Sequence, residues 1–225
     1  MGAFDWFWKA MGSQSERNDK KSKAIVGSAD EAARALGQQD DAAVAQAARD
    51  AVKGGEIADK AQFLAALAVA CERTLGMNPF NVQSQAVLRL LTGDVIQMAT
   101  GEGKTLVGAM AATGFALTGK RVHVVTVNNY LAARDAEWMR PVVEFFGLNV
   151  ASVTEGMTPD ERRAAYAQDI IYAPVNELGF DLLRDNQITD RSHTVQAAGD
   201  VALVDEADSV LVDEALVPLV LAGNR

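Results

Sequence analysis

The stretch that decides the fold is Met98-Ala99-Thr100-Gly101-Glu102-Gly103-Lys104-Thr105. Gly101 and Gly103 allow the backbone to turn so tightly that its N–H groups face inward. An apolar run typical of a helix follows directly, and backbone N–H groups at a helix N-terminus bind phosphate oxygens. The stretch is therefore typical of a phosphate-binding loop, in which Lys104 reaches the β- and γ-phosphates of a nucleotide and Thr105 coordinates Mg²⁺.

Both sides of this loop fit a strand–loop–helix unit. Apolar residues over 95–99 predict a buried strand, and residues 105–117 predict a helix whose N-terminus adds to anion binding. The usual pattern begins with Gly where this chain has Met98, so the plainest form of the motif is excluded. The nucleotide-binding residues predicted from the loop are Thr100, Gly101, Glu102, Gly103, Lys104 and Thr105.

Paired acids at the end of a second apolar run fit the same chemistry. Residues 201–204 are apolar, and Asp205 and Glu206 follow at the edge where a parallel sheet binds ligands. Asp205 would hold the Mg²⁺ shell, and Glu206 would orient or deprotonate the water that attacks the γ-phosphorus. Acids after a strand can also merely cap the next helix, but a phosphate-binding loop in the same chain favours a site for ATP and Mg²⁺. Lys104 and Glu206 are its predicted catalytic residues.

Short apolar strands alternate with amphipathic helices from Gly76 onward, which is the signature of a parallel α/β sheet. The predicted strands are 95–99, 122–127, 149–153, 169–173 and 200–205. The predicted helices between them are 105–117, 129–146, 158–167 and 177–185. We assign residues 76–225 to a nucleotide-binding domain and expect its carboxy end to be incomplete.

Residues 1–75 differ in character, being rich in Ala and charge, and they predict a helical amino-terminal segment. Ser28 and Glu31 have the spacing of a capping box, so one helix is expected to begin at Ser28. That helix is expected to break near Gly37.

Two further helices are expected, one from Asp40 to Gly54-Gly55 and one from about Ile57 to Leu75, which Gly76 ends. The second carries Cys71 toward the core. Because Cys71 is the only cysteine, no internal disulfide can form, and a reducing cytoplasm fits.

The composition bounds the class of protein. An apolar fraction of 49% in 225 residues is enough for one core and argues against disorder. A net charge of −9 gives no sign of a basic face, so nucleic acid is not expected as a ligand. No apolar run reaches the roughly 18 residues of a membrane span. We expect a cytoplasmic protein.

Several segments resemble the SecA family, the ATP-driven motors of bacterial protein export. Residues 76–83 are similar to the family's adenine-reading segment, in which Gln83 would hydrogen-bond the adenine edge. Met77 and Phe80 would pack on the base, although a polar residue that starts a helix is the plain alternative for Gln83. Three other segments are also similar to motifs of this family, namely residues 126–135, 176–186 and 205–215.

Departures from the family pattern indicate a particular branch. Ala99 stands where the housekeeping SecA usually has Arg, and Asn129 stands where it has Asp. Leu216-Val217 replaces the usual Arg-Thr. The chain is therefore more similar to the accessory SecA paralogue of actinobacteria, which exports a restricted set of proteins.

The resemblance implies a RecA-like fold and a motor that couples ATP binding and hydrolysis to the movement of preproteins through the SecYEG channel. It also implies peripheral association with the inner face of the cell membrane, and a homodimer is a further assembly to test. In the family, a second RecA-like domain supplies arginine fingers that stabilise charge on the transferring phosphoryl group. Without them, this chain is expected to bind ATP but to hydrolyse it poorly.

Two other classes of protein stay open. Residues 205–208 spell Asp-Glu-Ala-Asp, as in RNA helicases, although residues 126–129 lack the Pro-Thr-Arg-Glu segment expected of that class. The other class is a non-catalytic module whose nucleotide site only switches a docking surface.

The first residues of the chain suggest a lipid contact. Phe4, Phe7, Trp8 and Met11 would form one apolar stripe on a helix, and basic residues follow. Such a stripe can lie in a membrane interface and attract anionic lipid, or it can pack on the protein's own helices. Anionic lipid is therefore a candidate partner.

Overall fold

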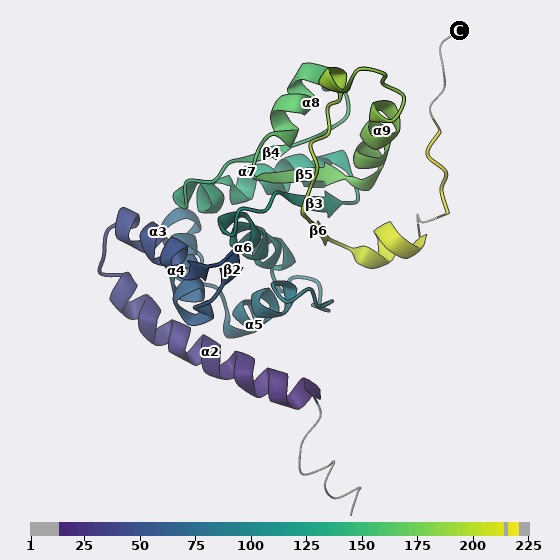
Figure 1. Cartoon of the computed structure of the whole chain (residues 1–225). Helices are drawn as coiled ribbons and strands as arrows, with labels where there is room; N and C mark the ends of the chain where they lie inside the picture. The colour runs from purple at the N-terminus through teal and green to yellow at the C-terminus, as the bar shows by residue number, and fades with distance from the viewer. Residues whose placement is uncertain (1–13, 214–215, 221–225) are drawn as a thin grey trace, which may run out of the picture. The chain divides into compact units, whose positions relative to one another are not determined.

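The computed structural model describes residues 14–213 and 216–220. The chain divides into two compact units at Glu102 and Gly103 (Figure 1). The functional boundary predicted near Gly76 stays a prediction. The aromatic stripe of residues 4–11 lies outside the described residues.

The amino-terminal unit is built around one buried helix. Its elements are α2 (Gln14–Leu36), α3 (Asp41–Asp50), β1 (Val52–Lys53), β2 (Glu56–Ile57), α4 (Lys60–Leu75) and α5 (Asn81–Leu90). Helix α4 contacts both α2 and α3, and its residues 63–67 are at most 2% exposed. The predicted helical character of this part of the chain is confirmed.

Local signals at two helix ends behave as predicted. Asp40 is the N-cap of α3, and its side chain accepts a hydrogen bond of 2.8 Å from the Ala43 N–H. Gly76 ends α4 in the left-handed conformation, with φ of 66°. Cys71 is fully buried in α4, and burial raises the pKa of its thiol to about 12, so it fills the core.

The predicted helix start at Ser28 is wrong, because α2 continues unbroken from Gln14 to Leu36. Val26 and Ala29, on either side of Ser28, are 2% and 5% exposed, and α2 packs on α4. A helix that began at Ser28 would need an extended residue there. Tertiary packing of the apolar face therefore overrides the local capping signal.

Gly54 and Gly55 form a turn that the sequence-based helix assignment missed. Strands β1 and β2 pair antiparallel on either side of them, with Lys53 opposite Glu56. Both glycines have positive φ, 62° and 77°, as a tight two-residue hairpin loop requires. The helix that begins after Asp40 therefore ends at Asp50, and a short hairpin follows.

The second unit is a four-stranded parallel sheet with helices. Its strands are β3 (Val122–Thr126), β4 (Val150–Ser152), β5 (Ile170–Pro174) and β6 (Val201–Val204), in the order β4-β5-β3-β6. Its helices are α6 (Lys104–Leu117), α7 (Asn129–Phe145), α8 (Pro159–Tyr166) and α9 (Val175–Asp185), with short turns η1 (Arg191–His193) and η2 (Ser209–Asp213). Every strand pair is parallel, which confirms the predicted α/β fold.

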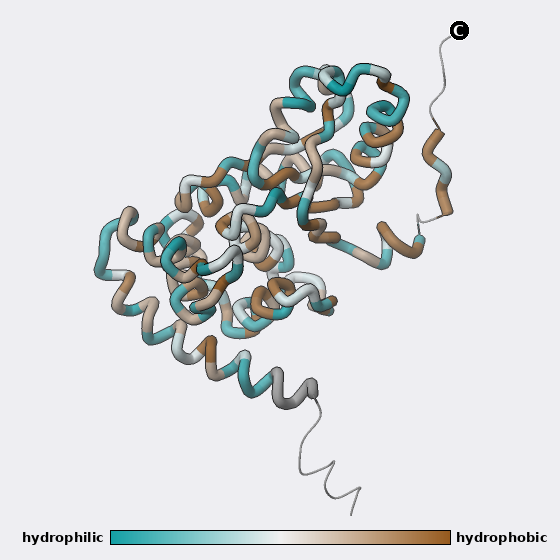
Figure 2. The backbone as a smooth tube through the Cα atoms, in the orientation of Figure 1, coloured by the Kyte–Doolittle hydropathy of each residue, from teal (hydrophilic) through white to brown (hydrophobic). Residues whose placement is uncertain are grey.

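Helices cover both faces of this sheet (Figure 1). On one face, α6 and α7 pack against strand residues such as Val124 and Ile170. On the other face, α8 packs against Ile171 and Ala173, with Tyr166 fully buried. Because both faces are covered, the inner strands are nearly continuous apolar runs. The described carboxy-terminal residues 216–220 are also mostly hydrophobic (Figure 2).

The strand predicted at 95–99 is absent, since residues 94–99 have no regular secondary structure. Val95 is 93% exposed, so this apolar run is not buried in a sheet. Branched apolar residues favour extended backbone, but a strand also needs a neighbour that completes its hydrogen-bond ladder. The four described strands of the sheet do not include this segment.

A buried network of charges joins α8 to α9. Arg162 of α8 donates to Glu177 (2.6 Å) and Asp181 (2.8 Å) of α9, and all three side chains are at most 8% exposed. Tyr166 also donates to Asp181, and Arg184 forms a second ion pair with Asp181 at 2.9 Å. Burial lowers the pKa of Arg162, but hydrogen bonds to Asp181 and Glu177 outweigh that effect and leave it raised. Asp181 is therefore buried, and its carboxylate connects α9 to Arg162 and Tyr166 of α8.

We expect Arg162→Met to lower the free energy of unfolding by about 3–5 kcal/mol, because Glu177 would remain buried without a cation and Asp181 would keep only its ion pair with the half-exposed Arg184. Urea denaturation followed by circular dichroism measures the change. The control is Arg163→Met, whose ion pair with Asp160 is exposed and should cost about 1 kcal/mol or less. Equal losses in the two variants would contradict the structural role of the network.

Candidate functional site

The loop from Ala99 to Glu102 is held closed by one side chain. The Ala99 N–H donates to Glu102 Oε2 (2.6 Å), and the Glu102 N–H donates to the Ala99 carbonyl (3.3 Å). Gly101, between them, has φ of 86°, in the left-handed region that favours glycine. Glu102 therefore has a structural part in the loop, which sequence reasoning had counted only as nucleotide contact.

Gly103 and Lys104 begin α6 in the manner of an anion site. Gly103 is the N-cap with φ of 80°, and no side chain caps the helix. A helix start without a side-chain cap carries the positive end of the helix dipole, which favours a negative ligand. Buried residues such as Val107 and Met110 anchor α6 in the core. This loop and helix start fit the phosphates of a nucleotide.

Asp205 lies at the carboxyl end of β6, as predicted. Its N–H donates to the Val125 carbonyl (2.9 Å), so the β3–β6 ladder continues to this residue. Glu206 follows with φ of 53°, and it is the single non-glycine residue with positive φ among residues 14–213 and 216–220. Such backbone strain costs roughly 1–3 kcal/mol and gathers at functional sites.

An acid that sequence reasoning did not assign lies near Asp205. Asp135 of α7 is 3% exposed and accepts a hydrogen bond of 2.7 Å from Arg134 Nε. Burial raises the pKa of Asp135, Arg134 lowers it in part, and nearby Asp205 adds to the rise. Arg134 also stacks over the Tyr130 ring, at 5.7 Å from its centroid. A buried acid near the carboxyl end of β6 was not predicted, since only tertiary packing brings Asp135 of α7 near Asp205.

Gln83 of α5 is buried and already makes two hydrogen bonds. Its Oε1 accepts from the Phe80 N–H and its Nε2 donates to the Glu102 carbonyl, both at 2.8 Å. The side chain is 5% exposed. It therefore connects the predicted adenine segment to the predicted phosphate loop within the amino-terminal unit.

The two apolar residues assigned to the adenine base are exposed. Phe80 is 73% and Met77 is 37% exposed, although both side chains are large. Exposed apolar surface of this kind commonly marks a binding surface. Both residues are therefore free of core packing and available to a planar ligand.

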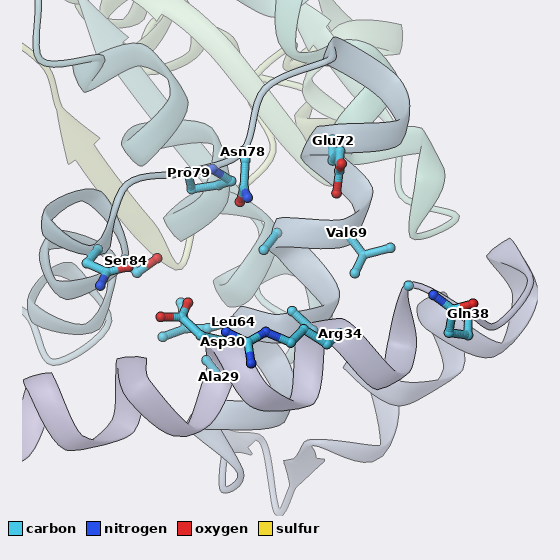
Figure 3. A pocket seen from close by; sticks show the side chains of 14 residues that line it. Ala29, Asp30, Arg34, Gln38, Leu64, Val69, Glu72, Asn78, Pro79 and Ser84 are labelled. Carbon is cyan, nitrogen blue, oxygen red and sulfur yellow. The ribbon is translucent and has the colours of Figure 1, made fainter.

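A cavity of about 600 Å³ adjoins the same segment (Figure 3). It lies among α2, α4 and residues 78–84, with Asn78 and Ser84 on its wall. Its charged side chains are Asp30, Glu72 and Arg34, so the acids outnumber the base and the lining does not favour phosphate. The phosphate-binding features thus belong to the loop and the start of α6.

Comparisons with known proteins bear on these residues. The family model described as "SecA DEAD-like domain" matches residues 7–225. The chain is 65% identical over its full length to a protein translocase subunit SecA 2 from Corynebacterium glutamicum. It is 54% identical over 97% of its length to the SecA 2 of Mycolicibacterium smegmatis, and 53% identical over 97% to that of Mycobacterium tuberculosis.

The chain spans only part of these relatives. It covers 30%, 28% and 27% of the three proteins, respectively. The matches confirm the resemblance to SecA and to its second actinobacterial form. They do not support the RNA helicase alternative.

Among the described residues, no helix is long and apolar enough to cross a membrane.

We expect Gln83→Ala to lower the free energy of unfolding by about 1–3 kcal/mol without any nucleotide, since the Phe80 N–H and the Glu102 carbonyl lose their partner. Urea denaturation of the ligand-free chain measures this loss. Gln85→Ala on the same helix, at a partly exposed residue, is the matched control and should have the smaller effect. If both variants unfold at the same urea concentration, the two hydrogen bonds carry no stability.

Proposed function

The chain belongs to the SecA family, and on that premise we propose that it is the ATP-binding motor domain of a preprotein translocase. The observation that carries the proposal is the left-handed loop at Gly101 and Gly103, which leads into the uncapped N-terminus of α6. That arrangement favours bound anions such as phosphate groups. ATP is the nucleotide, and Mg²⁺ accompanies it.

Phosphate binding is assigned to the start of α6. Lys104 supplies a positive charge for the β- and γ-phosphates, and backbone N–H groups of the first turn supply donors. These donors are already ordered, because α6 is anchored by its buried face. The binding energy is therefore not spent on folding the loop.

Metal and water chemistry is assigned to three oxygen-bearing side chains. Thr105 and Asp205 would hold Mg²⁺, which prefers oxygen ligands and keeps several waters. The ion would neutralise charge on the phosphates. Glu206, held in its left-handed conformation next to Asp205, would orient the attacking water.

Adenine recognition is assigned to Gln83, with Phe80 and Met77 packing on the base. In the ligand-free chain the Gln83 amide is satisfied by Phe80 and Glu102. The Gln83 Nε2 atom carries two hydrogens and donates one of them to the Glu102 carbonyl, so the other can donate to the base while the bond to Glu102 is kept. Base recognition would then act directly on the phosphate loop, since Glu102 belongs to it.

The wider function follows from the relatives, which are named as subunits of a protein translocase. We propose that the complete motor couples ATP hydrolysis to preprotein movement through the SecYEG channel at the inner face of the cell membrane. This chain covers about a third of such relatives or less. By itself it would bind ATP and turn it over slowly, because arginine fingers come from a second domain.

We expect Lys104→Ala to weaken Mg²⁺-ADP binding by about tenfold to a hundredfold, the usual value of a charged hydrogen bond to phosphate. Isothermal titration calorimetry measures the affinity, with GDP as the test of base selectivity. Lys120→Ala removes an exposed lysine that lies over Phe115 and should bind like the parent chain. A folded chain that binds neither nucleotide would refute the proposed site.

We expect vesicles rich in anionic lipid to bind the chain through residues 1–11. Deletion of these residues should abolish sedimentation with such vesicles, because the aromatic stripe and the first of the basic residues would be lost. Vesicles of neutral lipid serve as the control. Unchanged sedimentation of the deletion variant would remove the amino terminus as a lipid contact.

A further inference from the structure

The backbone of Glu206 is hydrogen-bonded on both of its sides. Its N–H donates to Oδ1 of Asp205 (3.0 Å), and its carbonyl accepts from the Val210 N–H (3.0 Å). Val210 is 5% exposed, so the second bond ties Glu206 to a residue of the buried core. Strained backbone persists where its surroundings over-determine it, and these two bonds restrain Glu206 at its φ of 53°.

The first of these bonds also restrains the Asp205 side chain. The backbone of Asp205 is fixed where its N–H donates to the Val125 carbonyl (2.9 Å), and its Oδ1 is fixed by the Glu206 N–H. Among the described residues, this is the one hydrogen bond found for the Asp205 carboxylate. Its Oδ2 atom is therefore left for a ligand.

The φ of Glu206 and the hydrogen bond to Asp205 depend on each other. The peptide between the two residues is planar, so ψ of Asp205 and φ of Glu206 are the angles that turn it. Because the chain is held by Val125 before this peptide and by Val210 after it, the two angles must change together. A turn that gave Glu206 an ordinary φ would carry its N–H away from Oδ1 of Asp205.

Glutamate is a costly choice for this backbone. Glycine adopts a positive φ freely and Asn adopts it more readily than most residues, so a turn at the end of β6 does not by itself call for Glu206. An outlier of this kind points to a use for both its side chain and its backbone. The use of the side chain is given under the proposed function, and the hydrogen bond to Asp205 indicates the use of the backbone.

We propose that Glu206 has a second role, carried by its backbone: its left-handed conformation positions the Asp205 carboxylate for a divalent cation. The part of Asp205 as a ligand of Mg²⁺ rests on the proposed function. Oδ1 is held by the Glu206 N–H, and Oδ2 is the atom left for the cation. Groups that orient a metal ligand change metal affinity by about tenfold to a hundredfold when they are lost. In this second role Glu206 is a positioning residue.

Thermal melting of the ligand-free chain tests the backbone of Glu206. We expect the Tm of Glu206→Val to lie about 2–6 °C below that of Glu206→Gly, because glycine adopts a positive φ freely. Asp208→Val and Asp208→Gly are the matched controls, at an exposed helical residue in the same segment. There the valine variant should melt no lower than the glycine variant, since glycine is the poorer helix former. The same order of Tm at both positions would overturn the proposal.

The Mg²⁺ dependence of ADP binding tests the positioning. Isothermal titration calorimetry gives the ratio of the ADP affinity with Mg²⁺ to that with a chelator. Glu206→Gly and Glu206→Asn tolerate the left-handed conformation, whereas the branched Cβ of Glu206→Val resists it. We expect the ratio to stay within about twofold of the parent in the first two variants and to fall roughly tenfold in the third.

The three variants separate the backbone from the side chain. All of them lack the carboxylate, and Asn is similar in bulk to Val, so neither feature accounts for a lower ratio in Glu206→Val alone. An equal ratio in all three would overturn the positioning role, as would a parent chain that binds ADP without any dependence on Mg²⁺. A folded parent chain that binds no ADP would refute the proposed function, and the positioning role with it.

Discussion

The parallel pairing of β3 with both β5 and β6 is the constraint on which the second unit depends. Because all the strands run in one direction, their carboxyl ends meet at one edge. Asp205 at the end of β6 is held there by the Val125 carbonyl. Helices α7 and α9 begin at the same edge, directly after β3 and β5. One hydrogen-bond ladder thus brings together Asp205, Glu206 and the previously unassigned Asp135.

Some polar side chains of the second unit stabilise its fold, and others lie at the carboxyl end of β6. Arg162 and its two carboxylates are buried and fully paired, so they fasten α9 and are not available to a ligand. Asp135 is buried too, and the pKa of its carboxyl group is raised first by burial and further by the nearby charge of Asp205, although Arg134 lowers it in part. Negative charge concentrated in this way favours a divalent cation beside it. The strained Glu206 lies at the same end of the strand, where the chain turns away from the sheet.

In the amino-terminal unit, hydrogen bonds order the loop from Ala99 to Glu102 in the absence of any ligand. Gln83 and Glu102 use side-chain atoms to satisfy backbone groups of the predicted adenine segment and of the predicted phosphate loop. These bonds lower the entropy that a nucleotide would otherwise have to remove. They also leave the second N–H of the Gln83 amide for a base, so that one side chain could join the base to Glu102.

The amino-acid sequence by itself determined the features that depend on neighbours along the chain. Left-handed Gly76, Gly101 and Gly103, the helix from Lys104 and the four strands of the sheet follow from backbone sterics and apolar periodicity. Tertiary structure decided the rest, because burial compares residues that are distant in sequence. Because α2 packs on α4, it continues past Ser28 as one helix. Residues 95–99 do not form a strand, because no neighbouring strand pairs with them. The same reason applies to the buried Asp181: no local pattern records which distant side chain will neutralise a buried charge.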